Sequence, residues 1–134
     1  MKRSIALTTF LVHDYDEAIE YFVKVLGFVL REDSDLGAGK RWVVVASDQD
    51  DPHGLLLALA VGDDQRRVVG NQTGGRVFQF LHTDDFERDY ARFRDRGVKF
   101  LESPRHESYG SVAVFADLWG NKWDLLERND GAQS

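Results

Sequence analysis

The feature that most constrains the fold of this chain is an internal repeat with an offset of 70 residues. Residues recur in the same order in both halves: Phe10-Leu11 as Phe80-Leu81, Asp14 as Asp84, Glu17 as Glu87, Gly27 as Gly97, and Val44-Val45-Ala46 as Val114-Phe115-Ala116. A solenoid would need at least three shorter repeats, so a single repeat of this length indicates two copies of one unit. The sequence therefore predicts two modules with the same fold.

Each module is predicted to contain a strand, a helix and three further strands. Runs rich in apolar and β-favouring residues give the strands, at 5–12, 28–31, 41–46 and 55–61 in the first module and at 76–81, 98–101, 112–115 and 122–127 in the second. Asp14 and Asp84 are placed as helix N-caps, and Gly27 and Gly97 as the residues that end the helices. The polar stretch that begins at Gly62 and continues to Gly75 is expected to be a linker.

We expect one domain over residues 1–128, made of modules at about 5–61 and 76–127, followed by a flexible tail at 129–134. The chain has 134 residues, 43% of them hydrophobic, which is enough for one core without cross-links. It has no cysteine, which excludes disulfides, thiolate zinc sites and a cysteine nucleophile.

Charge and hydropathy exclude two classes of partner. The formal net charge of −6 disfavours nucleic acid, because the phosphate backbone would be repelled at long range. No apolar run approaches the roughly 20 residues that span a bilayer, and the N-terminus has no feature of a signal peptide. We therefore expect a cytoplasmic protein with neither a nucleic-acid nor a membrane partner.

Three stretches of the sequence resemble the vicinal oxygen chelate superfamily, which includes glyoxalase I and the bleomycin-resistance proteins. They are the segments 12–28, 83–98 and 115–127, the last of which is similar to the family's ending F-x-D-P-x-G-N-x-W-x-L-x-E. The resemblance implies an α+β fold in which paired βαβββ modules form an open barrel-like cleft. It also implies a homodimer, since relatives commonly pair and open sheets leave edges to cover.

The same resemblance bears on metal binding. Metal-dependent members hold one divalent ion with four side chains, and the corresponding positions here are Leu7, Ala58, Val77 and Asp124. Three of the four are aliphatic, and a single carboxylate cannot replace the water shell of a divalent ion. We therefore predict no metal and no cofactor. An alternative is a relocated metal site, for which His13, Asp14, His82 and Asp84 are the candidates, although caps already engage the aspartates.

The predicted ligand site follows from strand alternation at and beside those positions. Residues two apart share a face of a strand, which gives a cleft lined by Leu7, Thr9, Val77, Gln79 and Asp124, with Trp42 and Tyr109 as aromatic walls. Asp124 is the only candidate catalytic group, as a polar handle or general base; its alternative role is an ion pair with Lys122 or an arginine. Thr9 and Gln79 either bind ligand or satisfy neighbouring backbone groups.

Other aromatic and loop residues receive structural roles. Phe78, Phe80 and Trp123 are expected to face the helices as core, and the segment from His106 to Gly110 is expected to be a mobile lip of the cleft. Burial of Asp124 should raise its pKa unless Lys122 or an arginine reaches it.

The leading functional hypothesis is a protein that binds a small, partly aromatic molecule without metal; whether it is also an enzyme stays open. The alternative is a metal-dependent glyoxalase-like lyase, isomerase or dioxygenase with relocated ligands. A third hypothesis is an interaction domain whose cleft is filled by its own side chains. The sequence names no ligand.

Overall fold

The computed structural model describes residues 1–129, which form two compact units, Met1–Val69 and a second unit that begins at Gly70. The first unit contains β1 (Leu7–Val12), α1 (Tyr15–Glu20), the π-helical turn η1 (Tyr21–Val25), β2 (Val29–Gly37), β3 (Lys40–Ala46), β4 (Gly54–Leu59) and α2 (Gly62–Val68). The second contains β5 (Val77–His82), α3 (Phe86–Asp95), β6 (Lys99–Phe100), β7 (Arg105–Glu107), β8 (Gly110–Ala116) and β9 (Lys122–Arg128). Of the predicted flexible tail 129–134, residues 130–134 lie outside the described residues.

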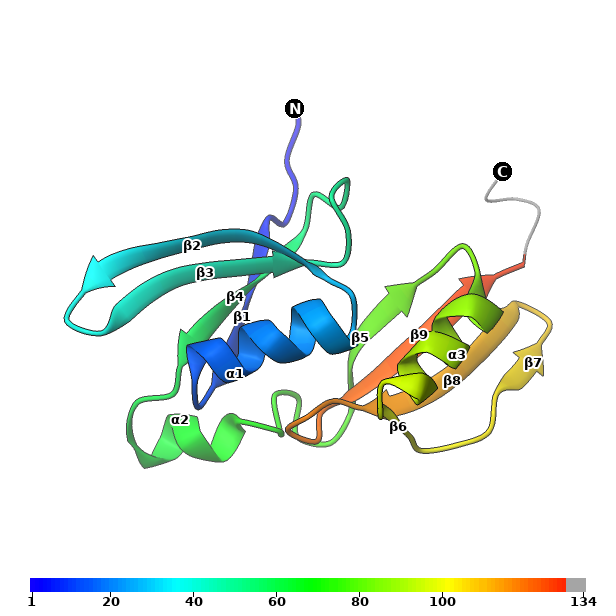
Figure 1. Ribbon diagram of the computed structural model, residues 1–134. Coiled ribbons are helices and arrows are strands. Elements are labelled where there is room, and N and C mark those ends of the chain that lie inside the picture. Colours follow the sequence, from blue (N-terminus) through cyan, green and yellow to red (C-terminus); the bar gives the residue numbers. More distant parts are fainter. Residues whose placement is uncertain (130–134) are drawn as a thin grey trace. The chain divides into compact units, whose positions relative to one another are not determined.

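The sheet of the first unit has the order β1-β4-β3-β2, with β1 parallel to β4 and the other pairs antiparallel. Successive side chains along each strand point to opposite faces of this sheet. Phe10, Val43 and Leu57 point to the face that α1 and η1 cover, where the Phe10 and Phe22 rings meet edge to face at 5.4 Å (Figure 1). The predicted order of one strand, one helix and three strands is confirmed in this unit, which ends with the additional helix α2.

The first helix begins and ends at the predicted residues. The Asp14 carboxylate accepts a hydrogen bond from the Glu17 amide at 2.9 Å, as an N-cap should. Gly27 has a φ of +74°, the left-handed conformation that ends a helix. The last turn is wider than expected, because the Leu26 amide donates to the Tyr21 carbonyl, five residues back, at 3.1 Å.

The β2–β3 hairpin is longer than predicted. The run Glu32 to Asp35 is polar and was expected to lie outside the strand, yet it pairs with β3 as far as Gly37. The Arg41 guanidinium donates to both Asp33 carboxylate oxygens, at 2.8 and 3.1 Å, so a cross-strand ion pair supports a segment that apolar patterning misses. A two-residue turn, Ala38-Gly39, with φ of 55° and 80°, connects the strands.

The predicted linker is not a plain loop. Residues Gly62–Val68 form α2, in which Asp63 and Asp64 pair with Arg66 and Arg67 one turn later. The second unit then begins with ordered contacts, since the Gln72 amide donates to the Asn121 side chain at 3.0 Å. The expectation of a linker from Gly62 to Gly75 is therefore wrong for Gly62–Val68, which are helical, whereas turns connect α2 to β5.

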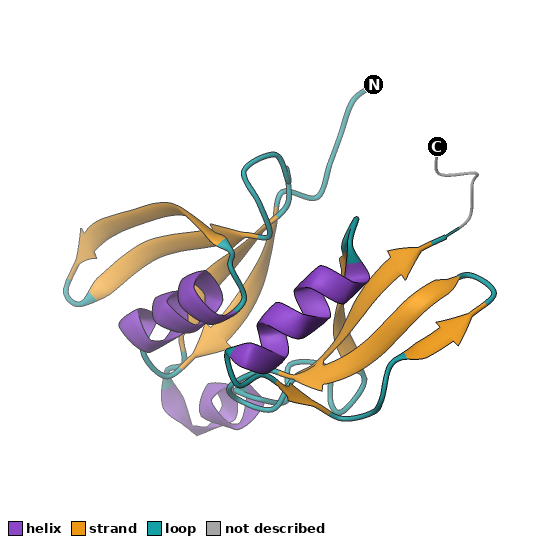
Figure 2. Ribbon diagram, turned by 45° about the vertical axis from the view of Figure 1, so that its right-hand side comes forward, coloured by secondary structure: helices purple, strands orange, loops and turns teal. Residues whose placement is uncertain are grey.

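The sheet of the second unit has the order β5-β9-β8-β6, with β7 paired to β8. Its outer pair, β5 and β9, is parallel, as in the first unit. One face packs on α3 through Phe93, Phe115 and Trp123, with ring centroids 5.4 Å apart for Phe93–Phe115 and 5.8 Å for Phe115–Trp123. Figure 2 shows that each unit has a helix lying along one face of its own sheet.

The predicted lip from His106 to Gly110 lies in a hairpin, in which Arg105–Glu107 pair with β8, and its mobility stays a prediction. Two other expectations for the second unit are wrong. Asp85, not Asp84, caps α3 by accepting from the Arg88 amide at 3.1 Å, and Asp84 instead accepts from the Arg88 guanidinium. Phe80 is 60% exposed and is not core, because a bulge in β5 turns it to the face of the sheet that α3 does not cover.

No helix among the described residues is long and apolar enough to cross a membrane. The superposition of the two units as copies of one module stays a prediction.

Candidate functional site

Three predicted site residues of the first unit lie on one face of its sheet. Leu7 and Thr9 on β1 are paired with Gly54 and Leu56 on β4. Trp42 on β3 precedes the buried Val43, so its side chain points to the opposite face of the sheet. The face that they share is the one not covered by α1. Leu7 and Trp42 are 36% and 37% exposed there, so an apolar side chain and an indole are available to a ligand.

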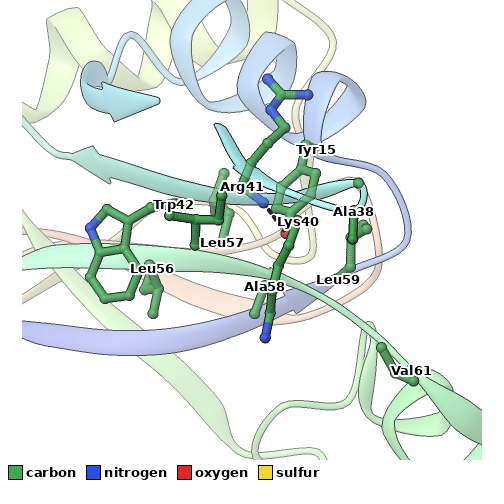
Figure 3. A pocket seen from close by; sticks show the side chains of 12 residues that line it. Tyr15, Ala38, Lys40, Arg41, Trp42, Leu56, Leu57, Ala58, Leu59 and Val61 are labelled. Carbon is green, nitrogen blue, oxygen red and sulfur yellow. Dashed lines mark hydrogen bonds between the residues drawn. The ribbon is translucent and has the colours of Figure 1, made fainter. Parts of the chain in front are cut away.

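A pocket of about 450 Å³ opens on this unit beside Trp42. It is lined by residues of α1, of the β2–β3 turn and of the ends of β3 and β4: Tyr15, Leu36, Ala38, Gly39, Lys40, Arg41, Trp42, Leu56, Leu57, Ala58, Leu59 and Val61. In Figure 3, Trp42 and Leu56 lie at one end of the pocket and Val61 at the other. The walls are therefore mainly apolar, with one aromatic ring.

The two cations of this pocket have different surroundings. Arg41 is held by Asp33 at 2.8 Å and Asp16 at 3.0 Å, and its guanidinium lies 5.0 Å from the centroid of the Tyr15 ring. Its backbone amide also donates to the Tyr15 hydroxyl at 3.1 Å (Figure 3). The hydrogen bonds from Arg41 lower the pKa of the Asp33 carboxyl. Lys40 is exposed and forms no ion pair among the described residues, so it is the available charge at the rim.

Sequence reasoning found Trp42 but missed most of this pocket. Leu36, Lys40 and Val61 lie at the end of the long hairpin or after β4, in segments predicted to be turn or strand end. The signal available was the pair of glycines at 37 and 39, which marks a tight hairpin turn. Reading that turn as the tip of a long β-hairpin would have placed Leu36 and Lys40 beside Trp42.

In the second unit, the site is centred on Asp124. Its neighbours across the sheet are Phe80 on β5 and Val114 on β8, and these pairs lie on the face opposite Trp123 and α3. The Asp124 side chain is partly buried, and its Oδ1 atom is buried with no hydrogen-bond partner. Asp124 therefore points away from the helix, as predicted, and one of its oxygens is unsatisfied.

A bulge in β5 changes which residues accompany Asp124. Val77 pairs with Lys122 and Gln79 pairs with Trp123, so Phe78 is an extra residue between them. After the bulge, Gln79 shares the face of Trp123, and Phe80 takes the face of Asp124. The prediction that Gln79 shares a face with Asp124 is wrong, and the aromatic residue of this face is one that alternation had assigned to the core.

The charges near Asp124 come from β7 and from the segment that precedes it. Burial raises the pKa of the Asp124 carboxyl, Arg105 lowers it and Glu102 raises it. Arg105 is itself held by Glu102 at 3.1 Å and Glu107 at 2.9 Å, and it also hydrogen-bonds Tyr109. Tyr109, a predicted aromatic wall, is 47% exposed in the β7–β8 turn. The predicted pairing of Asp124 with Lys122 is not present among the described ion pairs.

We predict that Asp124→Asn stabilises the protein at neutral pH by about 0.5–1 kcal/mol, allowing for solvent screening. The folded-state pKa of Asp124 is raised, so its contribution to stability is present below the unfolded pKa, near 4, and is lost as pH rises through the folded value. The advantage of Asp124→Asn should therefore shrink from pH 7 to pH 4 in urea unfolding. Asp95→Asn, at an exposed carboxylate of α3, is the control; a less stable Asp124→Asn at pH 7 would contradict the assignment.

The donors present do not fit a divalent ion. Leu7, Ala58 and Val77 offer no ligand atom, and neither unit gathers three or more His, Asp or Glu side chains able to hold a metal within residues 1–129. Asp14 caps α1 and Asp84 binds Arg88, so both aspartates of the alternative site are engaged. The two ring nitrogens of His53 lie within hydrogen-bond distance of the Ile5 carbonyl, at 3.1 Å, and of the Thr8 hydroxyl, at 2.9 Å. These contacts give His53 a structural role.

Comparisons with known proteins agree with this fold. A family model described as the Glyoxalase/Bleomycin resistance protein/Dioxygenase superfamily matches residues 4–125. An uncharacterized protein of Shewanella frigidimarina (strain NCIMB 400) is 51% identical over 131 residues, which cover 97% of each chain. The crystal structure of UcmS2 is similar with a TM-score of 0.79 and 27% identity, covering 94% of this chain and 98% of that one. TnmS3, an antibiotic binding protein from Streptomyces sp. CB03234, is similar with a TM-score of 0.74 and 26% identity, covering 96% and 98%.

Proposed function

We propose that this chain, which belongs to the Glyoxalase/Bleomycin resistance protein/Dioxygenase superfamily, binds a small, partly aromatic molecule without a metal ion. The observation that carries the proposal is the apolar pocket beside Trp42. The similarity to TnmS3, an antibiotic binding protein, supports the same class of activity, in which the protein holds a compound rather than a macromolecule.

The pocket has the size and chemistry of a small-molecule site. Its volume of about 450 Å³ lies within the range of roughly 300–1,000 Å³ that is usual for such sites. An indole that is 37% exposed beside the aliphatic side chains of Leu56 and Ala58 offers a flat surface on which a ring can stack. Lys40 at the rim can meet a carbonyl, phenolate or carboxylate of the same compound.

Binding without metal is favoured over glyoxalase-like catalysis. The aliphatic residues Leu7, Ala58 and Val77 stand where metal-dependent relatives have ligands, so an enediolate or an oxygen adduct would have no ion to stabilise it. Asp124 is the one candidate general base, and a reaction that used it would have to depend on side chains alone.

We predict that Trp42→Ala weakens binding of the ligand at least about tenfold, because the stacking surface is lost. A panel of aromatic antibiotics is screened for a rise in melting temperature of the wild-type protein, and the best compound is titrated into wild type and variant by isothermal titration calorimetry. The heat of binding does not depend on Trp42 as a reporter, so the affinities of the two proteins can be compared directly.

The control for this experiment is Leu118→Ala, which truncates an apolar side chain that is 53% exposed in the second unit and outside the pocket. It should bind as the wild type does, and Trp42→Phe should restore part of the affinity. Equal binding by wild type and Trp42→Ala would refute the assignment of this pocket, and elemental analysis that found one equivalent of metal would refute the metal-free mechanism.

A further inference from the structure

We propose that the face of the second sheet around Asp124 and Phe80 binds an organic cation, in the form of a protonated amine carried beside a flat ring. The site goes beyond the pocket of Trp42, because it lies on the other unit and selects a charge of the opposite sign from the one that suits Lys40. Its chemistry follows from an unsatisfied carboxylate oxygen, an exposed ring and the charges beside them.

The carboxylate is the first element of the site. Oδ1 of Asp124 is buried and accepts no hydrogen bond, although a buried carboxylate oxygen ordinarily has a donor. Leaving such an atom without a partner is costly, so this carboxylate is poorly satisfied within the protein. Oδ1 itself is closed to solvent, so a ligand meets the carboxylate where the partly buried Asp124 side chain is exposed, and an N–H group there would offset part of the cost. An ammonium group supplies both a donor and the opposite charge, which makes the hydrogen bond stronger than one from a neutral donor.

Within residues 1–129, Arg105 is the basic group that lowers the pKa of Asp124, and it is already engaged. Arg105 donates to Glu102 at 3.1 Å and to Glu107 at 2.9 Å, and these two carboxylates hold it. The Glu102 carboxylate is fixed in turn, because it accepts from the Val114 amide at 3.0 Å. Three carboxylates against one guanidinium leave these four groups with a formal charge of −2, so the field at Asp124 favours a cation.

Arg128 on β9 shares this face but lies four residues beyond Asp124 and is exposed, so its charge is screened at that distance. Two charged or titratable residues lie nearer to Asp124. Lys122, two residues before Asp124 on β9, is exposed, so water and salt screen its charge. His82, at the end of β5, is paired with Leu126 rather than with Asp124 and is also exposed. Neither provides a hydrogen bond to Asp124 among the described residues, so neither replaces the missing donor.

The exposed ring is the second element. The β5 bulge turns Phe80 onto the face of Asp124, where it is paired with that residue across the parallel strands. Its side chain is 60% exposed, unlike Phe115 and Trp123 on the helix-covered face, which are buried. A ring next to a carboxylate suits an aromatic amine, whose ring packs on Phe80 while its ammonium group reaches Asp124.

The test compares three probes with one ring and one chain length: phenethylamine, 2-phenylethanol and phenylacetate. Binding is followed at pH 7 by chemical-shift titration of the labelled full-length protein. The amine should bind at least tenfold more tightly than the alcohol, and phenylacetate should bind more weakly than either. Asp124→Asn should remove the preference for the amine over the alcohol, whereas Asp95→Asn, which changes the net charge equally, should keep it. Phe80→Ala should weaken binding of both.

A wild-type protein that binds the alcohol as tightly as the amine would overturn the proposal, and so would an Asp124→Asn variant that keeps the preference. The Trp42→Ala variant separates this outcome from the proposed function. The Trp42→Ala variant should keep the same ratio of amine affinity to alcohol affinity as the wild type, even if it no longer binds the antibiotics. If that ratio fell to one in Trp42→Ala, the preference for the amine would arise in the first unit, and the proposal for Asp124 would be wrong.

Discussion

Asp117→Ala should destabilise the protein by about 3–5 kcal/mol, the largest effect that we expect from a single substitution. Asp117 is 6% exposed and accepts hydrogen bonds from five donors between β8 and β9. These are the amides of Trp119, Gly120 and Asn121 at 2.9–3.0 Å, the Asn121 side-chain amide at 2.9 Å and the Trp123 indole at 3.0 Å.

The size of the effect follows from what alanine would leave behind. The Asn121 and Trp123 side chains are 4% and 2% exposed, so their N–H groups could not turn to solvent once the carboxylate was gone. Each unsatisfied buried donor costs about 1–3 kcal/mol, partly relieved where water enters. A domain of this size is stable by about 5–15 kcal/mol, so the variant should lose a large share of that margin.

Urea unfolding of Asp117→Ala measures this loss, through a lower midpoint at an unchanged slope. The control is Asp35→Ala, because Asp35 lies in β2 next to the hairpin turn but is exposed and, among the described residues, accepts only the Gly37 amide, at 2.8 Å. The control should lose less than about 1 kcal/mol. Equal losses in the two variants would mean that the five hydrogen bonds around Asp117 contribute little beyond an ordinary turn.

The turn around Asp117 illustrates which features of the fold the sequence pattern could predict and which it could not. The run from Phe115 to Glu127 carried the family resemblance, and the strands predicted at 112–115 and 122–127 leave a short connection between them, where the structure has a turn. The convergence of five donors on one carboxylate could not be predicted, because alternation specifies the face of a strand but not the path of a turn. The buried face of β9 was predictable, because Trp123 and Leu125 alternate with Lys122 and Asp124. β3 and β8 are instead continuous apolar runs, in which alternation of residue type does not identify the buried face.

The errors have local physical causes. One extra residue at Phe78 exchanges the faces of Gln79 and Phe80, and nothing in the composition of β5 marks the bulge. The polar half of β2 pairs because Arg41 binds Asp33 across the hairpin, an interaction between residues eight apart that hydropathy cannot register. Each unit has its candidate site beside one of these irregularities, so the predicted site residues included Trp42 and Asp124 but not Leu36, Lys40 or Phe80.

Gly70→Ala should destabilise the protein by roughly 3 kcal/mol, the second-largest effect that we expect. Gly70 has a φ of +81°, and a Cβ atom placed on it would lie 2.1 Å from the Trp119 carbonyl oxygen and 3.0 Å from the Trp119 carbonyl carbon. Both atoms belong to the backbone of the Asp117 turn, so no side-chain rotation can relieve the overlap. The first residues of the second unit or the turn must move, and the hydrogen bond from Gln72 to Asn121 would be strained with them.

Gly74→Ala separates the two parts of this effect. Gly74 has a similar φ of +68°, but a Cβ atom there would meet nothing within 4 Å. It should therefore lose only the roughly 1 kcal/mol that alanine pays for a left-handed conformation, and the excess in Gly70→Ala measures the close approach to Trp119. Urea unfolding of both variants gives the difference directly. A loss in Gly70→Ala no larger than in Gly74→Ala would show that the segment at Gly70 moves away from the turn at little cost, and that its close approach to Trp119 contributes little to stability.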